Sequence, residues 1–223
     1  MDPPHRYLDR LEAGRILAGR LRQYADRPGV LVLALPRGGV PVGLEVARQL
    51  NVPLDVFVVR KLGTPGHEEL AMGAIASGGV RVENERVIQS LGIDKSAVDE
   101  VAERELEEVR RRERYYRDDR PPPKVQGRTV ILVDDGLATG STMAAAAAAL
   151  RKLGPARLVI AVPVGAPESC AYLRRSADEV VCVQTPEDFT AVGEWYEDFG
   201  QTTDEEVRAL LNQEIGTRVP EMH

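Results

Sequence analysis

The chain has 223 residues, of which 43% are hydrophobic and 29% are charged, a composition typical of a globular protein in water. A chain of this length buries about 70% of the surface that its unfolded form exposes, so we expect one domain, residues 1–223, with small attachments. No apolar stretch approaches the roughly 20 residues needed to cross a bilayer, and no signal-peptide core follows the N-terminus. We therefore expect a cytoplasmic protein that binds no membrane.

The net charge of −6 gives no general attraction for nucleic acid, so we expect no nucleic-acid partner, and any phosphate binding must be local. Two cysteines, Cys170 and Cys182, are too few for a disulfide framework or a cysteine-rich zinc site. Because Cys182 lies within an apolar run, we expect it to be buried for structural reasons.

Five short apolar runs rich in β-branched residues predict buried strands. They are Val30 to Leu35, Leu54 to Val59, Thr129 to Val133, Leu158 to Val162 and Val180 to Val183. Helical patterns cover Val42 to Leu50, Thr142 to Leu153 and Pro167 to Arg175. This alternation predicts an α/β fold, a Rossmann-like and mainly parallel sheet with helices on both faces.

Segments outside this alternation also carry predictions. A further helix is expected from Asp9 to Tyr24, and Gly63 to Gly79 is expected to be a long mobile loop with one short strand, because it holds five glycines. Residues 81–124 are expected to form a mainly helical insert. Its charged part, Glu103 to Arg120, contains seven arginines and seven acids and so predicts a solvated helix face.

The segment VDDGLATGST, Val133 to Thr142, carries the clearest chemistry. The third predicted strand ends directly in Asp134 and Asp135, and a turn of small and hydroxyl-bearing residues leads into an alanine-rich helix. Ligands of open α/β sheets bind at the carboxyl ends of strands. Carboxylates accept hydrogen bonds from sugar hydroxyls, while small residues and a helix N-terminus favour a phosphate group.

Other phosphate-binding motifs fit this chain less well. The sequence has no Gly-Lys-Ser/Thr of a P-loop and no GxGxxG after the first strand. A plain strand-to-helix turn, capped by Thr or Ser, is the structural alternative, but it leaves two adjacent carboxylates without a purpose.

Two further segments carry candidate anion-binding groups. Arg37, Gly38 and Gly39 follow the first strand and offer a forked cation beside exposed N–H groups, although a simple turn into a helix would also explain them. Arg60 and Lys61 end the second strand, where cations would stabilise a departing anion. The alternative there is a solvated strand end.

These motifs together resemble the type I phosphoribosyltransferase family over roughly residues 30 to 185. The resemblance implies that Asp134 and Asp135 contact the ribose hydroxyls of phosphoribosyl pyrophosphate (PRPP) and its metal ion, directly or through water. It implies that Ala138, Thr139, Gly140, Ser141 and Thr142 surround the 5′-phosphate. It also implies that Arg37, Gly38, Gly39 and Lys61 bind the pyrophosphate, and that Lys61, Arg60 and Glu69 belong to the catalytic loop.

The resemblance also sets expectations about the cofactor, the acceptor and the assembly. Mg²⁺ is implied by the diphosphate substrate, since it needs few protein ligands. Ala138 stands where hypoxanthine-guanine enzymes carry an aspartate, so the acceptor is named only as a nitrogen nucleophile of the nucleobase class. A homodimer is expected. The C-terminal segment 185–223, with Phe189, Trp195, Tyr196 and Phe199, is expected to form a hood whose rings either stack on a base or fill a small core.

The sequence therefore predicts an enzyme that transfers the phosphoribosyl group of PRPP to a nucleobase and releases pyrophosphate. Two alternatives stay open. A regulatory protein would keep the PRPP site without transfer, and a metal-dependent sugar-phosphate hydrolase would use the acid pair, although no additional ligand set is evident.

Overall fold

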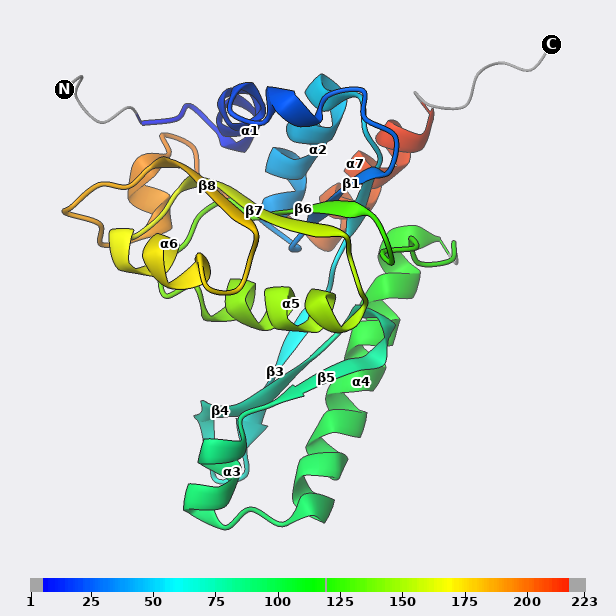
Figure 1. Cartoon of the computed structure of the whole chain (residues 1–223), viewed down its shortest axis with the longest axis vertical. Helices are drawn as coiled ribbons and strands as arrows, with labels where there is room; N and C mark the ends of the chain where they lie inside the picture. The colour runs from blue at the N-terminus through cyan, green and yellow to red at the C-terminus, as the bar shows by residue number, and fades with distance from the viewer. Residues whose placement is uncertain (1–5, 119, 217–223) are drawn as a thin grey trace.

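The computed structural model describes residues 6–118 and 120–216 of the chain, with side chains to residue 213. A central sheet lies between two helical layers, and a second, smaller sheet with its own helices projects from one side (Figure 1). The predicted hood reaches beyond these residues, so its last part, 217–223, lies outside the described chain. No helix among the described residues is long and apolar enough to cross a membrane.

The central sheet has five parallel strands in the order β2-β1-β6-β7-β8. They are β1 (Val30–Ala34), β2 (Leu54–Val56), β6 (Thr129–Val133), β7 (Arg157–Val164) and β8 (Glu179–Gln184). The predicted α/β fold is confirmed, because a parallel strand forms in each of the five predicted runs. The second one is shorter than predicted, since it ends at Val56 and leaves Val59, Arg60 and Lys61 to the smaller sheet. The last one differs in burial, since β8 is an edge strand whose residues stay half-exposed.

Helices cover both faces of this sheet (Figure 1). One layer holds α1 (Arg10–Gly19) and α2 (Gly39–Leu50), and the opposite layer holds α5 (Ser141–Lys152) and α6 (Pro167–Leu173). Alternate residues of β1 serve the two layers, because Leu31 and Leu33 pack with the α5 side while Val30 and Val32 pack with the α2 side. The first helix is shorter than predicted, since it stops at Gly19 and a 3₁₀ turn, η1 (Arg22–Tyr24), follows.

The expected mobile loop at Gly63 to Gly79 is wrong. This segment belongs to an antiparallel sheet of order β3-β4-β5 with strands at Val59–Thr64, His67–Ala76 and Val80–Glu83, joined by a 3₁₀ turn, η2 (Ser77–Gly79). Two of these glycines, Gly63 and Gly73, lie where a side chain would collide with the backbone of the neighbouring strand. A Cβ on Gly73 would stand 2.5 Å from the carbonyl oxygen of Val82 on the neighbouring strand. The high glycine content of this segment therefore reflects close strand pairing rather than a loop.

Two helices, α3 (Glu85–Leu91) and α4 (Lys95–Arg117), pack with this smaller sheet. The prediction of a solvated face on α4 is wrong at Arg117, which is only 4% exposed. Its guanidinium binds the carboxylates of Asp55 at 2.8 Å and Glu113 at 2.7 Å and the carbonyl oxygen of Val56 at 2.8 Å. Arg117 thereby ties the end of α4 to the edge strand of the central sheet.

The two chain ends meet beside the central sheet. Tyr7 forms a parallel bridge with Tyr196, just after the 3₁₀ turn η3 (Val192–Trp195), and its hydroxyl donates to the Pro163 carbonyl at 2.8 Å. The final helix, α7 (Asp204–Gly216), packs against α2 and α4. The N-terminal segment and residues 189–200 thus form one unit over β7.

Replacing Arg117 by Met should lower the free energy of unfolding by about 3 kcal/mol, because the Asp55 and Glu113 carboxylates would lose their buried partner. Arg111→Met is the matched control on the same helix, since Arg111 is exposed and solvent screens its pair with Glu108, so the loss of stability should be much smaller. Denaturant unfolding measures both. Equal losses in the two variants would contradict the assigned role of Arg117.

Candidate functional site

Two carboxylates lie at the carboxyl end of β6 and are held by contacts from three parts of the chain. Asp134 Oδ1 accepts a hydrogen bond from the backbone N–H of Asp135 at 2.9 Å. Asp135 Oδ2 accepts from Nε of Arg10, on α1, at 2.8 Å. The hydroxyl of Tyr196 donates to the backbone carbonyl of Asp135 at 2.6 Å. The acid pair is therefore fixed in place rather than left to solvent.

The two carboxylates of the acid pair are close together and, among the described residues, are balanced by a single nearby cation, Arg10. Burial raises the pKa of Asp134 well above its usual range, and the charge of Asp135 raises it further. Burial also raises the pKa of Asp135, while the Arg10 guanidinium opposes that change. One arginine faces two carboxylates, so the site favours a further cation or hydrogen-bond donors.

The turn after the acids presents donors to solvent. Ala138, Thr139, Ser141 and Thr142 are exposed, and Gly140 adopts the left-handed φ of 70° that glycine favours. The Thr139 and Ser141 hydroxyls lie 2.7 Å apart. Gly140 is the N-cap of α5 and has no side chain that could cap the helix, while the N–H of Ser141 makes a long hydrogen bond of 3.4 Å to Thr139 Oγ1. A helix N-terminus whose N-cap residue carries no side chain attracts anions.

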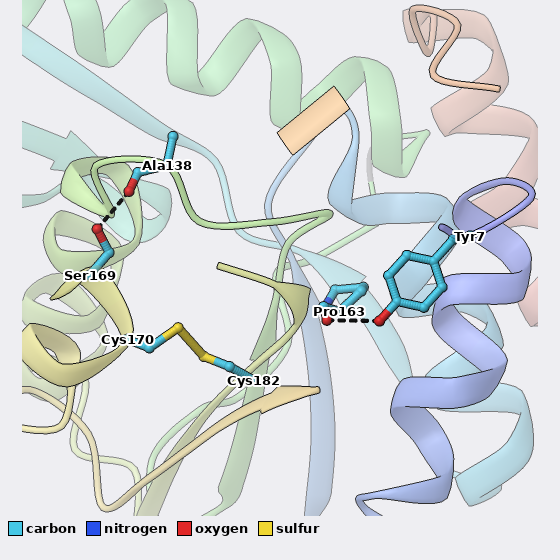
Figure 2. Close-up of a disulfide and its surroundings, with 6 residues drawn as sticks. All are labelled: Tyr7, Ala138, Pro163, Ser169, Cys170 and Cys182. Atoms are coloured by element: carbon cyan, nitrogen blue, oxygen red, sulfur yellow. Dashed lines mark hydrogen bonds between the residues drawn. A yellow bond between two sulfur atoms is a disulfide. The ribbon is translucent and has the colours of Figure 1, made fainter. Parts of the chain in front are cut away.

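Helix α6 lies beside this turn and is bonded to it (Figure 2). The Ser169 hydroxyl donates to the carbonyl oxygen of Ala138, and the next residue, Cys170, forms a disulfide with Cys182 of β8. The expectation that Cys182 is buried is wrong. Cys182 lies half-exposed on the edge strand, where it can reach α6, while Cys170 is buried.

The loop after β1 lies directly against the acid pair. A Cβ on Gly38 would overlap the Asp135 carboxylate, and one on Gly39 would stand 2.8 Å from the carbonyl oxygen of Val133. Only glycine allows this approach. Arg37, which follows a cis peptide bond, is half-buried, and no carboxylate of the described residues pairs with it. Arg37 precedes these two glycines in the loop, and its charge acts on the Tyr116 hydroxyl of α4, whose pKa it lowers against the effect of burial.

The hairpin residues are not brought to the acid pair. Arg60 binds Glu105 of α4 at 2.8 Å, and Lys61 lies 3.4 Å from Glu69 across the β3 and β4 hairpin. Within the described part of the chain, no hydrogen bond or ion pair joins these residues to the turn after β6. The structure thus assembles two of the three predicted segments.

Three residues of the site were missed from the sequence, namely Arg10, Ser169 and Tyr196. Arg10 and Asp135 are 125 residues apart, and a lone arginine in a helical pattern reads as a surface charge. Tyr196 was expected either to stack on a base or to fill a small core, and the contact of its hydroxyl with Asp135 was not predicted. The aromatic segment mainly fills a core, because Trp195 and Tyr196 are buried with Tyr7 and Ala13.

Comparison with known proteins agrees with this geometry. Residues 6–198 match the model of the phosphoribosyl transferase domain, so the chain belongs to the phosphoribosyl transferase family. The chain is 48% identical over 205 residues to a provisionally named phosphoribosyl transferase of Mycobacterium tuberculosis; the match covers 92% of this chain. It covers 46% of that protein, so this chain spans about half the length of its curated relative.

A solved structure shows the same fold over almost its whole length. The crystal structure of TT1426 from Thermus thermophilus is 45% identical and superposes with a TM-score of 0.83. The match covers 93% of this chain and 98% of TT1426. The α/β fold of the chain is therefore shared with an experimentally determined relative.

Replacing Cys182 by Ser should lower the free energy of unfolding by about 3 kcal/mol, because the disulfide closes a short loop in the unfolded chain. Denaturant unfolding with and without dithiothreitol is the measurement. The reductant should destabilise the natural chain by a similar amount and leave Cys182→Ser unchanged. If dithiothreitol leaves the free energy of unfolding of the natural chain unchanged, the disulfide is contradicted.

Proposed function

We propose that this chain transfers the phosphoribosyl group of PRPP to a nitrogen acceptor of the nucleobase class and releases pyrophosphate. One observation carries the proposal: the Asp134 and Asp135 carboxylates precede, within one turn, the N-terminus of α5 at the carboxyl end of the central sheet. Acceptors for sugar hydroxyls and donors for a phosphate thus lie within one turn. Membership of the phosphoribosyl transferase family supports the proposal.

The residues of the site have distinct roles in this proposal. Asp134 and Asp135 accept hydrogen bonds from the ribose hydroxyls. The backbone N–H groups and hydroxyls of residues 138–142 hold the 5′-phosphate against the N-terminus of α5. Gly38, Gly39 and Arg37 bind the pyrophosphate, because their loop lies directly against the acids and Arg37 has no carboxylate partner among the described residues.

The donor set fits Mg²⁺ that arrives with the diphosphate. No group of three or more His, Cys, Asp or Glu side chains that could hold a metal occurs among the described residues. Mg²⁺ needs only one or two carboxylates when substrate oxygens and water complete its shell. Asp134 and Asp135 are the residues that would hold it, since the arginine at the pair, Arg10, binds only Asp135, and the bound ion would neutralise the diphosphate.

The chemistry requires positioning and charge stabilisation rather than a covalent intermediate. The bond between the anomeric carbon and the pyrophosphate oxygen breaks, the bond to the acceptor nitrogen forms, and the acceptor proton passes to solvent. The carboxylates stabilise the positive charge that develops on the ribose ring. Lys61 and Arg60 would stabilise the leaving group only after the hairpin exchanges its ion pairs with Glu69 and Glu105.

The direct test incubates the protein with PRPP, Mg²⁺ and a panel of nucleobases and measures pyrophosphate release and nucleotide formation. We expect release that depends on one or more bases, and a loss of about 100-fold or more in the Asp134→Asn/Asp135→Asn variant, because two charged hydrogen-bond acceptors disappear. Tight PRPP binding without turnover for any base would favour a PRPP-sensing regulator. Phosphate release without a base would favour a hydrolase.

Replacing Gly38 by Ala should weaken PRPP binding by about tenfold or more, because the added methyl group would displace the Asp135 carboxylate. Gly19→Ala is the matched control, since no atom lies within 4 Å of a Cβ at that position. Isothermal titration calorimetry with PRPP and Mg²⁺ measures both variants. Unchanged affinity of Gly38→Ala would contradict the placement of this loop at the site.

A further inference from the structure

Arg10 is an almost buried cation that joins the N-terminal helix to the acid pair. Its side chain is only 12% exposed, although it belongs to the first turn of α1. Nε donates to Asp135 Oδ2 at 2.8 Å, and Nη1 donates to the carbonyl oxygen of Gly200 at 2.7 Å. The guanidinium carbon lies 4.0 Å from the ring centroid of Phe199. Three separate contacts therefore fix one guanidinium.

The groups that hold Arg10 are themselves fixed by the junction of the two chain ends. The N–H of Tyr7 donates to the Trp195 carbonyl at 2.9 Å, and the N–H of Asp198 donates to the Leu8 carbonyl at 2.9 Å. The rings of Tyr196 and Phe199 lie 5.1 Å apart. These contacts attach segment 195–200 to the residues directly before α1. The only ring of this segment with substantial exposure, Phe199, lies against Arg10 instead of standing free for a base.

Arg10 binds only one of the two carboxylate oxygens of Asp135. Arg10 binds Oδ2 of Asp135, so Oδ1 stays outside the ion pair. On the other side, a Cβ at Gly38 would come within 3.3 Å of Arg10 Nε and would overlap Asp135 Oδ2. The loop after β1, the arginine and the carboxylate thus lie so close together that residue 38 has no room for a side chain. A buried ion pair of this kind contributes little net stability, so its geometry calls for a second explanation.

We propose that Arg10 is a positioning residue for the donor substrate, which holds Asp135 by one oxygen so that the other can accept a ribose hydroxyl. The inference rests on the proposed function. It assigns to the joined chain ends a role in binding PRPP, whereas the sequence suggested either contact with the acceptor base or a small core. Arg10 acts through Asp135 and does not touch the reacting atoms.

The test measures PRPP binding with Mg²⁺ by calorimetry, and steady-state kinetics, for Arg10→Met, Arg10→Lys and the control Arg15→Met. Arg15 lies on the same helix and is half-exposed. We expect PRPP affinity to fall about tenfold or more in Arg10→Met, to recover in part in Arg10→Lys, and to stay unchanged in Arg15→Met. The KM for PRPP should rise, while the KM for the base changes by less than about threefold.

A double-mutant cycle separates positioning from a general loss of structure. If Arg10 acts through Asp135, then adding Arg10→Met to Asp135→Asn should weaken PRPP binding by less than about threefold beyond Asp135→Asn alone. Equal factors in both backgrounds would overturn the inference. If Arg10→Met fails to fold, Phe199→Leu, which loosens the same guanidinium, takes its place and should raise the PRPP dissociation constant in the natural background only.

The experiments distinguish an error in the role of Arg10 from an error in the proposed function. If the natural chain binds no PRPP, both the proposed function and the role of Arg10 are contradicted. A natural chain that binds PRPP, with Arg10→Met binding equally well, would overturn the role of Arg10 and leave the proposed function standing.

Discussion

The parallel pairing of β1 with β6 is the constraint on which the site depends. Ala34 pairs with Val133, so the two strands end at the same level and their following loops emerge side by side. The glycines at 38 and 39 then allow the first loop to lie on the carboxylates of the second. Everything that binds an anion or a sugar in the proposed site follows from that register, because the carboxyl ends of parallel strands share one edge of the sheet.

The central sheet and the turn after β6 could be predicted from the sequence because both are local patterns. Buried parallel strands read as continuous apolar runs, and Asp134 to Thr142 is one uninterrupted segment. The antiparallel sheet could not be predicted in the same way. Its glycines at 63 and 73 satisfy close contacts with neighbouring strands, and such contacts depend on pairing that a single segment does not reveal. Arg117 shows the same limit, because its partner Asp55 lies 62 residues away.

The site shows a similar division between local and distant contacts. The acid pair, the phosphate turn and the glycine loop were predicted, while Arg10 and Ser169 were not, since each reaches the site through folding alone. The hairpin residues Lys61 and Glu69 pair with each other in this structure. The proposed PRPP-binding side of the site is therefore assembled, whereas the role proposed for the hairpin would require its movement toward that side.

The most direct test of the central claim is a crystal structure of the protein with PRPP and Mg²⁺. The account predicts the 5′-phosphate on residues 138–142, the ribose hydroxyls on Asp134 and Asp135, and the pyrophosphate on the loop of Arg37 to Gly39. Arg10 should keep its bond to Asp135 Oδ2 in that complex. A PRPP molecule bound elsewhere, or bound here with its ribose turned away from the two carboxylates, would contradict it.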